Sequence, residues 1–363
     1  MFVDKPLPSE RPTGMGIAAY SMARAVSDRG IPVDFVCRGE KKEVTYTEIN
    51  LRVYKTPHYS TQNILAAANL LSSGRPEVFH VHSSSALPSL ILAKVLGIRT
   101  IVHAHGVEAF RLDRTSIMRL ATLGLCDRIV AVSQSTKEGL LRSTPLSPRK
   151  IDVVYNGVDA ADLVDIDQRG LGTDFELEGF DELMLSIGAV YRTKRQDLVI
   201  DSLPAILKEH PRLAYLNAGP VYDKSYLNSL IERAHTLGVA KSVKFPGLVS
   251  RKQVAILLRR ADLCVHPSER EGFPLAVLEE MACGKPVIAA NIPSIREIIV
   301  DGVDGILLKK AEPDDLARLS IDLLRDRKYR QEIGESARNK VMKNFSWETC
   351  ALKLEHIYRS LTS

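Results

Sequence analysis

Residues 262–290 read DLCVHPSEREGFPLAVLEEMACGKPVIAA, and this stretch decides the fold. It begins with a short apolar run, Asp262–His266, and ends with another, Pro286–Ala290. Between them, Val277–Ala282 continues a helical pattern that stops at Gly284. Strands that are apolar on both faces are typical of parallel sheets covered by helices. The stretch therefore predicts a strand–helix–strand unit of a parallel sheet.

The same alternation of strand and helix repeats over most of the chain. The other predicted strands are Pro32–Cys37, Val78–His82, Thr100–His103, Arg128–Ser133, Asp152–Tyr155, Glu182–Gly188, Leu213–Ala218, Ser242–Phe245 and Gly305–Leu308. The predicted helices include Ile17–Arg29, Ala86–Leu96, Ser135–Leu141, Leu198–Glu209, Tyr226–Leu237, Lys252–Arg260 and Trp347–Ser360. This order predicts an α/β fold built from doubly wound parallel sheets.

The alternation stops between Asp159 and Asp181, a glycine-containing acidic stretch without a clear period. A chain of 363 residues has the usual length of two domains. We predict a Rossmann-like domain over residues 1–163, a linker over 164–180 and a second Rossmann-like domain over 181–345. The helix of residues 346–363 is expected to pack back on the first domain.

The net charge and the cysteines exclude several classes of protein. Lys and Arg number 49 and Asp and Glu 44, so the formal charge is +5. That excess suits an anionic small ligand or an anionic membrane surface, and lacks the dense basic face of a nucleic-acid binder. The five cysteines are scattered without a C-x-x-C pair, which predicts reduced thiols rather than a zinc site or disulfides.

The chain shows neither a signal peptide nor a membrane span. Residues 1–14 are polar and contain three prolines, unlike a signal peptide. Apolar runs fall short of the ~20 residues that cross a bilayer. We expect a cytoplasmic protein that at most touches the inner face of a membrane.

The turn after Asp262–His266 is the best candidate for a binding site. Ligands of open parallel sheets bind beyond the carboxyl ends of the strands, where loops enter helices. Pro274 is expected near the first helical position, where its missing N–H costs nothing. The N–H groups of that first turn can hold a phosphate. Glu271 then stands at the mouth of the loop, and Glu279 lies more than two helical turns further on.

Spacing alone leaves a second interpretation of these carboxylates open. Glu271 and Glu279 are also compatible with two solvated groups that flank the start of a helix, and spacing alone favours this interpretation. Glu269, Arg270 and Glu280 indicate that this region tolerates charge.

The segment resembles the signature of the retaining GT-B glycosyltransferases of family 4, in which an E-x7-E pair follows a P-S-x-x-E-G-F/L turn. The matching residues are Pro267, Ser268, Glu271, Gly272, Phe273, Glu279, Met281, Ala282, Gly284 and Pro286–Ile288. Further matches, spread over nearly the whole chain, are Val81–Ser83, His105–Gly106, Ala131–Ser133, Tyr155–Asp159, Ala218–Pro220, Phe245–Gly247, Glu297–Gly302, Gly305 and Phe345–Trp347. Their order and spacing together make the resemblance specific.

The resemblance implies an activity as well as a fold. It implies two domains that face each other across a cleft, with the donor bound by the second and the acceptor by the first. The reaction would move a sugar from a nucleotide diphosphate sugar, a co-substrate, to a glycan or lipid-linked glycan with retention. Surface polysaccharide or glycolipid biosynthesis is the implied setting.

The resemblance also gives roles to residues of the turn. Glu271 would contact the donor sugar and help to place its anomeric carbon. Glu279 would bind the ribose hydroxyls, since a carboxylate accepts two O–H bonds at once. Pro274 stands where the family usually has Gly and cannot donate, so an N–H contact must come from Phe273 or Leu275. The N–H of Gly272 belongs to the same set.

The leaving nucleotide diphosphate needs positive charge nearby. Lys194 fits the family's G-R-x-x-x-x-K pattern, whose Arg and Lys both bind the diphosphate. Ala189 occupies the position of the Arg, so either Arg192 or Arg195 is expected to replace it. An Asp-x-Asp pair followed by further carboxylates is absent from this region of the sequence, so we expect no metal and no other cofactor.

His105 is the candidate on the first domain. It follows a predicted strand and sits where the family places a histidine that contacts the donor sugar. It would act without serving as a base if the leaving phosphate accepts the acceptor's proton. His80, His82 and His103 are interpreted as structural.

Gly14–Ala19 contains G-x-G-x-x-A, which resembles a dinucleotide fingerprint. Such a fingerprint directly follows a strand, and here only Met1–Val3 is apolar before a proline-rich turn. An NADP-dependent reductase is therefore the less favoured alternative, and Gly16 is expected to let the backbone approach the sugar or phosphate. The short apolar run means either that the true start lies upstream or that the first strand is stunted.

Two questions stay open at this stage. The chain could bind a sugar nucleotide without transferring the sugar, or epimerise it. Phe110–Leu120 mixes basic and apolar residues, so it either rests on an anionic membrane near a lipid-linked acceptor or packs on its own sheet as an ordinary helix.

Overall fold

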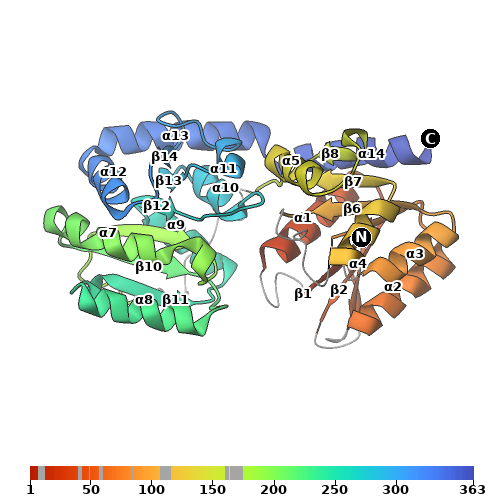
Figure 1. The fold of residues 1–363 in the computed structure, drawn as a ribbon, viewed down its shortest axis with the longest axis horizontal. Helices are drawn as coiled ribbons and strands as arrows, with labels where there is room; N and C mark the ends of the chain where they lie inside the picture. Colours follow the sequence, from red (N-terminus) through yellow and green to blue (C-terminus); the bar gives the residue numbers. More distant parts are fainter. Residues whose placement is uncertain are drawn as a thin grey trace. The chain divides into compact units, whose positions relative to one another are not determined.

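The computed structural model describes residues 1–6, 13–39, 43–48, 50–56, 60–82, 86–106, 116–159, 163 and 175–363. They form two compact units, Met1–Gly157 with Phe345–Ser363, and Val158–Asn344. Each unit is a largely parallel sheet with helices on both faces (Figure 1). The predicted α/β class with two doubly wound sheets is confirmed. Most of the predicted linker, 164–180, lies outside the described residues.

The first unit contains an eight-stranded sheet in the order β3-β4-β2-β1-β5-β6-β7-β8. Its strands are β1 (Phe2–Pro6), β2 (Val33–Arg38), β3 (Glu43–Glu48), β4 (Leu51–Thr56), β5 (Val78–Val81), β6 (Arg99–Ala104), β7 (Arg128–Ala131) and β8 (Ile151–Val153). Among the described residues, only β3 and β4 pair antiparallel. These two strands at the sheet edge alternate polar and apolar residues, so they lack the continuous apolar run by which the inner strands were predicted.

The first strand, β1, extends beyond the apolar run Met1–Val3. β1 spans five residues and pairs in parallel with β2 and β5, in the middle of the sheet. Phe2 and Val3 are buried. The second half of the strand carries Lys5 and Pro6, and its place in the sheet comes from backbone pairing rather than from an apolar sequence.

Helices cover the two faces of this sheet in two groups. The helices are α1 (Gly14–Asp28), α2 (Ser60–Gly74), α3 (Leu87–Val95), α4 (Ser116–Leu125), α5 (Gln134–Ser143) and α14 (Trp347–Thr362). Apolar residues of α2 to α5 share one core with Phe79, Val81 and Val102 of the central strands. On the other face α14 packs on α1, and Arg29, the C-cap residue of α1, pairs with Glu355 of α14 at 2.6 Å.

A glycine permits the C-terminal helix to join the first unit. A Cβ atom on Gly157 would lie 2.3 Å from the backbone nitrogen of Trp347, closer than any side chain can approach. Only glycine fits where the end of the first unit meets the start of α14. This contact accounts for two of the matched segments, Tyr155–Asp159 and Phe345–Trp347.

The second unit contains six parallel strands in the order β11-β10-β9-β12-β13-β14. These are β9 (Glu182–Ile187), β10 (Leu213–Ala218), β11 (Val243–Gly247), β12 (Leu263–His266), β13 (Val287–Ala290) and β14 (Ile306–Leu308). The helices around them are α7 (Gln196–Glu209), α8 (Lys224–Thr236), α9 (Arg251–Arg260), α10 (Leu275–Ala282), α11 (Pro293–Arg296), α12 (Pro313–Arg325) and α13 (Arg327–Asn344). Every residue of β10, β12, β13 and β14 is buried, as the apolar runs predicted. In the described part of the chain, the helices are too short or too polar to cross a bilayer.

Candidate active site

The turn from Pro267 to Pro274 lies at the carboxyl end of β12, in the middle of the second sheet. Pro274 is the N-cap residue of α10 rather than its first helical residue, with φ −73° and ψ 114°. The helix therefore starts at Leu275, and the first bond within it runs from Leu278 N to Pro274 O. The N–H groups of Leu275 to Val277 have no acceptor inside α10, which makes this end of the helix suited to an anion.

Lys194 and Glu271, predicted from separate motifs, meet in the structure. Lys194 lies in a short 3-10 helix, Arg192–Lys194, after β9, and β9 is the neighbour of β12. Its Nζ lies 2.5 Å from Oε1 of Glu271, and the two side chains are only 18% and 12% exposed. The structure thus brings a cation and a carboxylate together at the carboxyl edge of the sheet, beside the start of α10.

Backbone and buried amide groups hold this pair in place. The N–H of Glu269 donates to Thr193 O at 2.9 Å, which joins the two loops directly. Gln196 Nε2 donates to Ala189 O at 3.0 Å, and Asn217 Nδ2 donates to Gly188 O at 3.1 Å. The loop that carries Lys194 is therefore fixed at both of its ends.

Gly219 allows the strand ends to come this close. A Cβ atom there would lie 2.1 Å from the carbonyl oxygen of Gly188. The matched segment Ala218–Pro220 thus supports the Lys194 loop.

Glu279 is buried on the inner side of α10 and has a partner that the sequence did not reveal. Arg251, the first residue of α9, donates from Nη1 to Oε1 of Glu279 at 2.5 Å. Glu279 is 8% exposed and Arg251 39% exposed. The only signal in the sequence was that Arg251 follows β11, whose carboxyl end lies at the same edge of the sheet.

The interpretation of Glu280 as a sign of tolerated surface charge is wrong. Glu280 is fully buried, and its Oε1 lies 2.7 Å from Nε2 of His266, the last residue of β12. Burial raises the pKa of the Glu280 carboxyl, although the neighbouring His266 opposes this shift. The pair ties α10 to the end of β12 and so fixes the shape of the turn between them.

Arg192 and Arg195 have different surroundings. Arg195 has a left-handed backbone, φ 55°, and its guanidinium contacts Asp197 and Glu269 at 3.2 and 3.3 Å. Arg192 is 72% exposed, with Asp223 4.0 Å away and the Tyr226 ring 5.4 Å from its Cζ. Arg195 is thus held by two carboxylates, whereas Arg192 lies on the surface.

In the first unit, His105 follows β6 and is partly exposed. Its Nε2 lies 2.9 Å from Nδ1 of the buried His82. Burial lowers the pKa of His105 to about 4, so the ring is neutral at physiological pH. This is consistent with a histidine that makes a hydrogen bond and carries no charge.

Gly16 lies in the first turn of α1, not in a loop before the helix. Its N–H donates to the side chain of the N-cap residue Thr13 at 3.1 Å, and the residue is buried. The predicted helix start at Ile17 is therefore three residues late. Of the amphipathic segment Phe110–Leu120, the part up to Thr115 lies outside the described residues, and α4 begins at Ser116.

Two family models match the chain and together span most of it. The model for Glycosyltransferase Family 4 matches residues 12–162, and that for Glycosyl transferases group 1 matches residues 174–340. An uncharacterized glycosyltransferase of Methanocaldococcus jannaschii is 27% identical over 328 residues, 89% of this chain and 86% of that protein. The N-acetyl-alpha-D-glucosaminyl L-malate synthase of Bacillus anthracis is 26% identical over 368 residues, 95% and 93% of the two chains.

Solved structures share the fold. The HepE protein of Anabaena in complex with UDP-glucose has a TM-score of 0.80 at 19% identity, over 99% of this chain and 98% of that one. Sucrose-phosphate synthase from Thermosynechococcus elongatus has a TM-score of 0.78 at 20% identity, over 99% and 96%.

Proposed function

Because the chain belongs to the group 1 glycosyltransferases of family 4, with the GT-B fold, we propose that it transfers a sugar from a nucleotide diphosphate sugar with retention of configuration. The observation that carries this proposal is the Lys194–Glu271 pair beside the start of α10. A cation and helical N–H groups suit a diphosphate, and an adjacent carboxylate suits sugar hydroxyls. The three features occur together at the edge of the sheet where ligands bind.

The proposed reaction breaks the bond between the anomeric carbon and the diphosphate oxygen. The acceptor hydroxyl forms the new bond on the same face, and its proton passes to the leaving phosphate oxygen. Lys194 and the first-turn N–H groups of α10 stabilise the negative charge that builds up on the diphosphate. Glu271 holds the sugar and lies near the positive charge that develops at the anomeric carbon.

Glu279 is assigned to the nucleotide end of the donor. Its carboxylate accepts hydrogen bonds from the two ribose hydroxyls, and Arg251 keeps the carboxylate oriented through the 2.5 Å ion pair. For the second cation on the diphosphate we assign Arg192 rather than Arg195, because Arg195 already binds Asp197 and Glu269. Arg192 is exposed and can turn toward an anion without breaking a close ion pair.

A donor screen tests the proposal. UDP-, GDP-, ADP- and dTDP-sugars are incubated with the protein, and bound nucleotide and released nucleotide diphosphate are both measured. We expect a UDP-sugar to bind and to release UDP, because the similar HepE protein is known in complexes with UDP and UDP-glucose. The proposal is wrong if none of these nucleotides binds at millimolar concentration while NADPH does.

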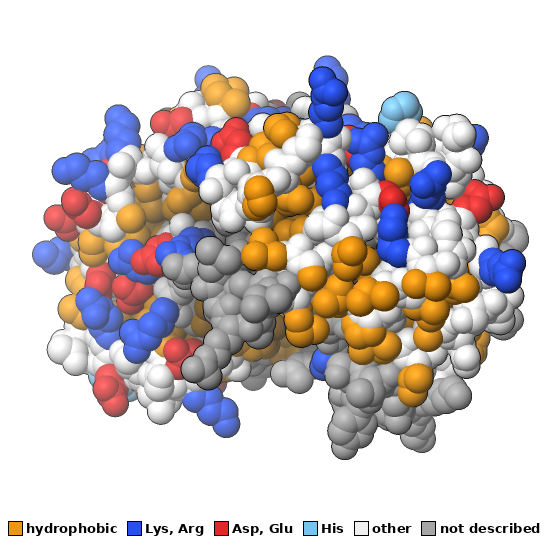
Figure 2. Space-filling model, turned by 45° about the vertical axis from the view of Figure 1, so that its right-hand side comes forward, with side chains coloured by type: hydrophobic (Ala, Val, Ile, Leu, Met, Phe, Trp, Pro, Cys, Tyr) orange, Lys and Arg blue, Asp and Glu red, His pale blue; other side chains and the backbone are white. Residues whose placement is uncertain are grey.

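We further propose that the acceptor lies at an anionic membrane surface. Helices α2, α3 and α4 lie side by side in the first unit (Figure 1). We call their solvent-facing apolar residues the apolar face: Leu65, Ile91, Val95, Leu96, Met118 and Leu125, which are 37% to 78% exposed. Figure 2 shows apolar side chains gathered on this side of the molecule.

Charge supports a lipid surface as the occupant of the apolar face. The sequences of α2, α3 and α4 contain no Asp or Glu. Three exposed cations lie near these helices: Arg75 directly after α2, Lys94 in the last turn of α3, where it pairs with Asp127 at 2.7 Å, and Arg99 at the start of β6. An apolar face with basic and few acidic neighbours suits a bilayer with anionic headgroups, and a lipid-linked acceptor would be found there.

Vesicle flotation tests the apolar face. The protein is expected to float with phosphatidylglycerol vesicles at low salt. With phosphatidylcholine vesicles it is expected to remain unbound in the bottom fraction. Val95→Asp, at a side chain 78% exposed, should weaken binding by about tenfold through lost apolar contact and charge repulsion. Val303→Asp, at an exposed valine of the second unit, is the matched control. Equal loss in both variants, or dimerisation abolished by Val95→Asp without vesicles, contradicts the membrane assignment.

A further inference from the structure

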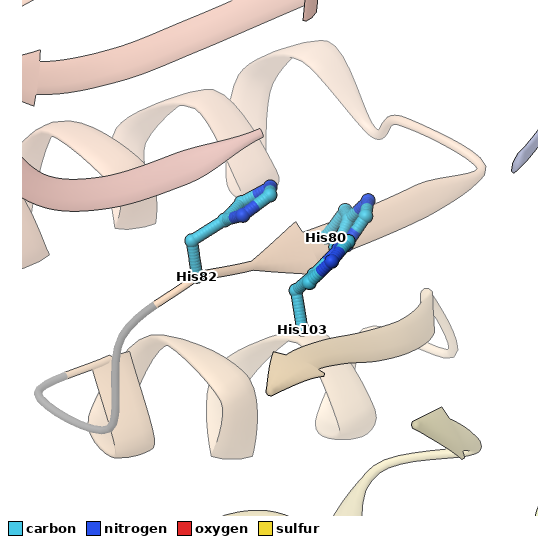
Figure 3. Close-up of side chains that lie close together, drawn as sticks. All are labelled: His80, His82 and His103. Atoms are coloured by element: carbon cyan, nitrogen blue, oxygen red, sulfur yellow. The ribbon is translucent and has the colours of Figure 1, made fainter. Parts of the chain in front are cut away.

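Four histidines of the first unit form a stack on one face of the sheet. His80 lies in β5 and His82 just after it, and His103 lies in the neighbouring β6, followed by His105. Alternate residues of a strand share a face, so the four rings gather on the side covered by α1 and α14. Neighbouring ring centroids are 4.5 to 5.3 Å apart. Figure 3 shows His80, His82 and His103.

A shared metal ion does not fit the hydrogen bonds that these rings make. The nitrogens of His80, His82 and His103 lie within 4.8 Å of one another. The three rings are stacked, with interplanar angles of 14° to 22°. Both nitrogens of His80 already have hydrogen-bond partners, the Tyr358 hydroxyl at 2.7 Å and His103 Nδ1 at 3.2 Å, so His80 has no nitrogen left for an ion. We therefore interpret the cluster as a hydrogen-bonded stack.

The rings are neutral, so each has one donor and one acceptor nitrogen. Burial lowers the pKa of His80, His82 and His103 well below the usual value, and the pKa of His105 to about 4. His80 uses both of its nitrogens, on the Tyr358 hydroxyl at 2.7 Å and on His103 Nδ1 at 3.2 Å. That leaves His82 and His105 as a separate pair.

The His82–His105 hydrogen bond links the tautomers of its two rings. It joins Nδ1 of His82 to Nε2 of His105 at 2.9 Å, and among the described residues the buried Nε2 of His82 has no partner. If His82 carried its proton on Nε2, a buried N–H would be left without an acceptor, which proteins rarely accept. With the proton on Nδ1, His82 donates to His105, and only a lone pair is left unpaired. His105 must then carry its own proton on Nδ1.

We propose that His82 is a positioning residue that fixes His105 as the Nδ1–H tautomer. His105, the partly exposed end of the stack, then presents a neutral N–H donor to an oxygen of the substrate. That the oxygen belongs to a sugar nucleotide rests on the proposed function. The tautomer itself follows from the hydrogen bonds within the first unit.

Nitrogen NMR of the whole protein tests the tautomer without substrate. Protein labelled with ¹⁵N-histidine is recorded at neutral pH, and the His105 signals are assigned by their loss in His105→Asn. We expect a protonated Nδ1 and an unprotonated Nε2. Asn and Leu are similar in size, but only Asn places an N–H near the position of His82 Nδ1. His82→Asn should keep this tautomer, and His82→Leu should yield a mixture.

Activity measurements on the same two variants test the positioning role. His82→Leu is expected to lower kcat about three- to tenfold with a smaller change in KM, and His82→Asn should restore most of that loss. The proposal is overturned if wild-type His105 carries its proton on Nε2, if His82→Leu leaves the tautomer unchanged, or if both variants lose activity equally. Failure of the donor screen would not affect the NMR result, so the two proposals fail separately.

Discussion

Glu271→Gln is expected to lower sugar transfer by at least about 100-fold, while the affinity for UDP changes by less than about threefold. The substitution keeps the shape of the side chain and removes its negative charge beside the developing charge of the transition state. It also releases Lys194 from its 2.5 Å ion pair, so the diphosphate no longer competes with Glu271 for that cation. Transfer is measured as UDP release in the presence of acceptor, and UDP binding by calorimetry.

Glu269→Gln provides the matched control for this prediction. Glu269 lies two residues away in the same turn, but it is 50% exposed and pairs with Arg195 instead of Lys194. Its loss should change transfer by less than about threefold, because exposed ion pairs contribute little. A Glu271→Gln protein with transfer near the wild-type rate would show that Glu271 does not act on the sugar. A parallel loss of UDP affinity would assign it to the nucleotide instead.

The fold was predictable where a strand is a continuous apolar run and was missed where polar residues or proline interrupt that run. Buried parallel strands such as β10 and β12 are continuous apolar runs, and the sequence placed them to within a residue. The β3–β4 hairpin was missed because its residues alternate, and β1 because Lys5 and Pro6 interrupt its apolar run. In those strands the pairing of the backbone decides the structure, and pairing partners are distant in sequence.

The contacts of the candidate site could also be predicted only in part. Lys194 and Glu271 follow β9 and β12, and the carboxyl ends of neighbouring parallel strands lie together, so their proximity follows from topology. The pairing of Arg251 with Glu279 and that of His266 with Glu280 could not be predicted, because both depend on how α9 and α10 pack beside β12. Glu280 looked like a surface charge only because its partner, His266, is 14 residues away in the sequence.

Part of the histidine stack could have been predicted from the sequence. His80 and His82, and likewise His103 and His105, are spaced by two residues at the ends of predicted strands, so each pair shares a face of the sheet. The order of the strands in the sheet could not be predicted from the sequence. β5 and β6 turn out to be neighbours, which brings the two pairs into contact.

Lys194→Ala is expected to weaken UDP binding by about 10- to 100-fold, with a matching loss of transfer at low donor concentration. The substitution removes the cation proposed for the diphosphate and leaves Glu271, only 12% exposed, without this partner close to the incoming anion. Both effects oppose binding, and both should shrink as salt screens the charges.

Lys241→Ala is the control for Lys194→Ala. Lys241 is exposed and lies just before β11, at the amino ends of the strands, whereas the proposed site lies at their carboxyl ends. In a double variant with Glu271→Gln, part of the lost affinity should return, because the repelling carboxylate is gone. If Lys194→Ala binds UDP like the wild type, the diphosphate is held by other cations, and Arg192→Ala becomes the decisive variant.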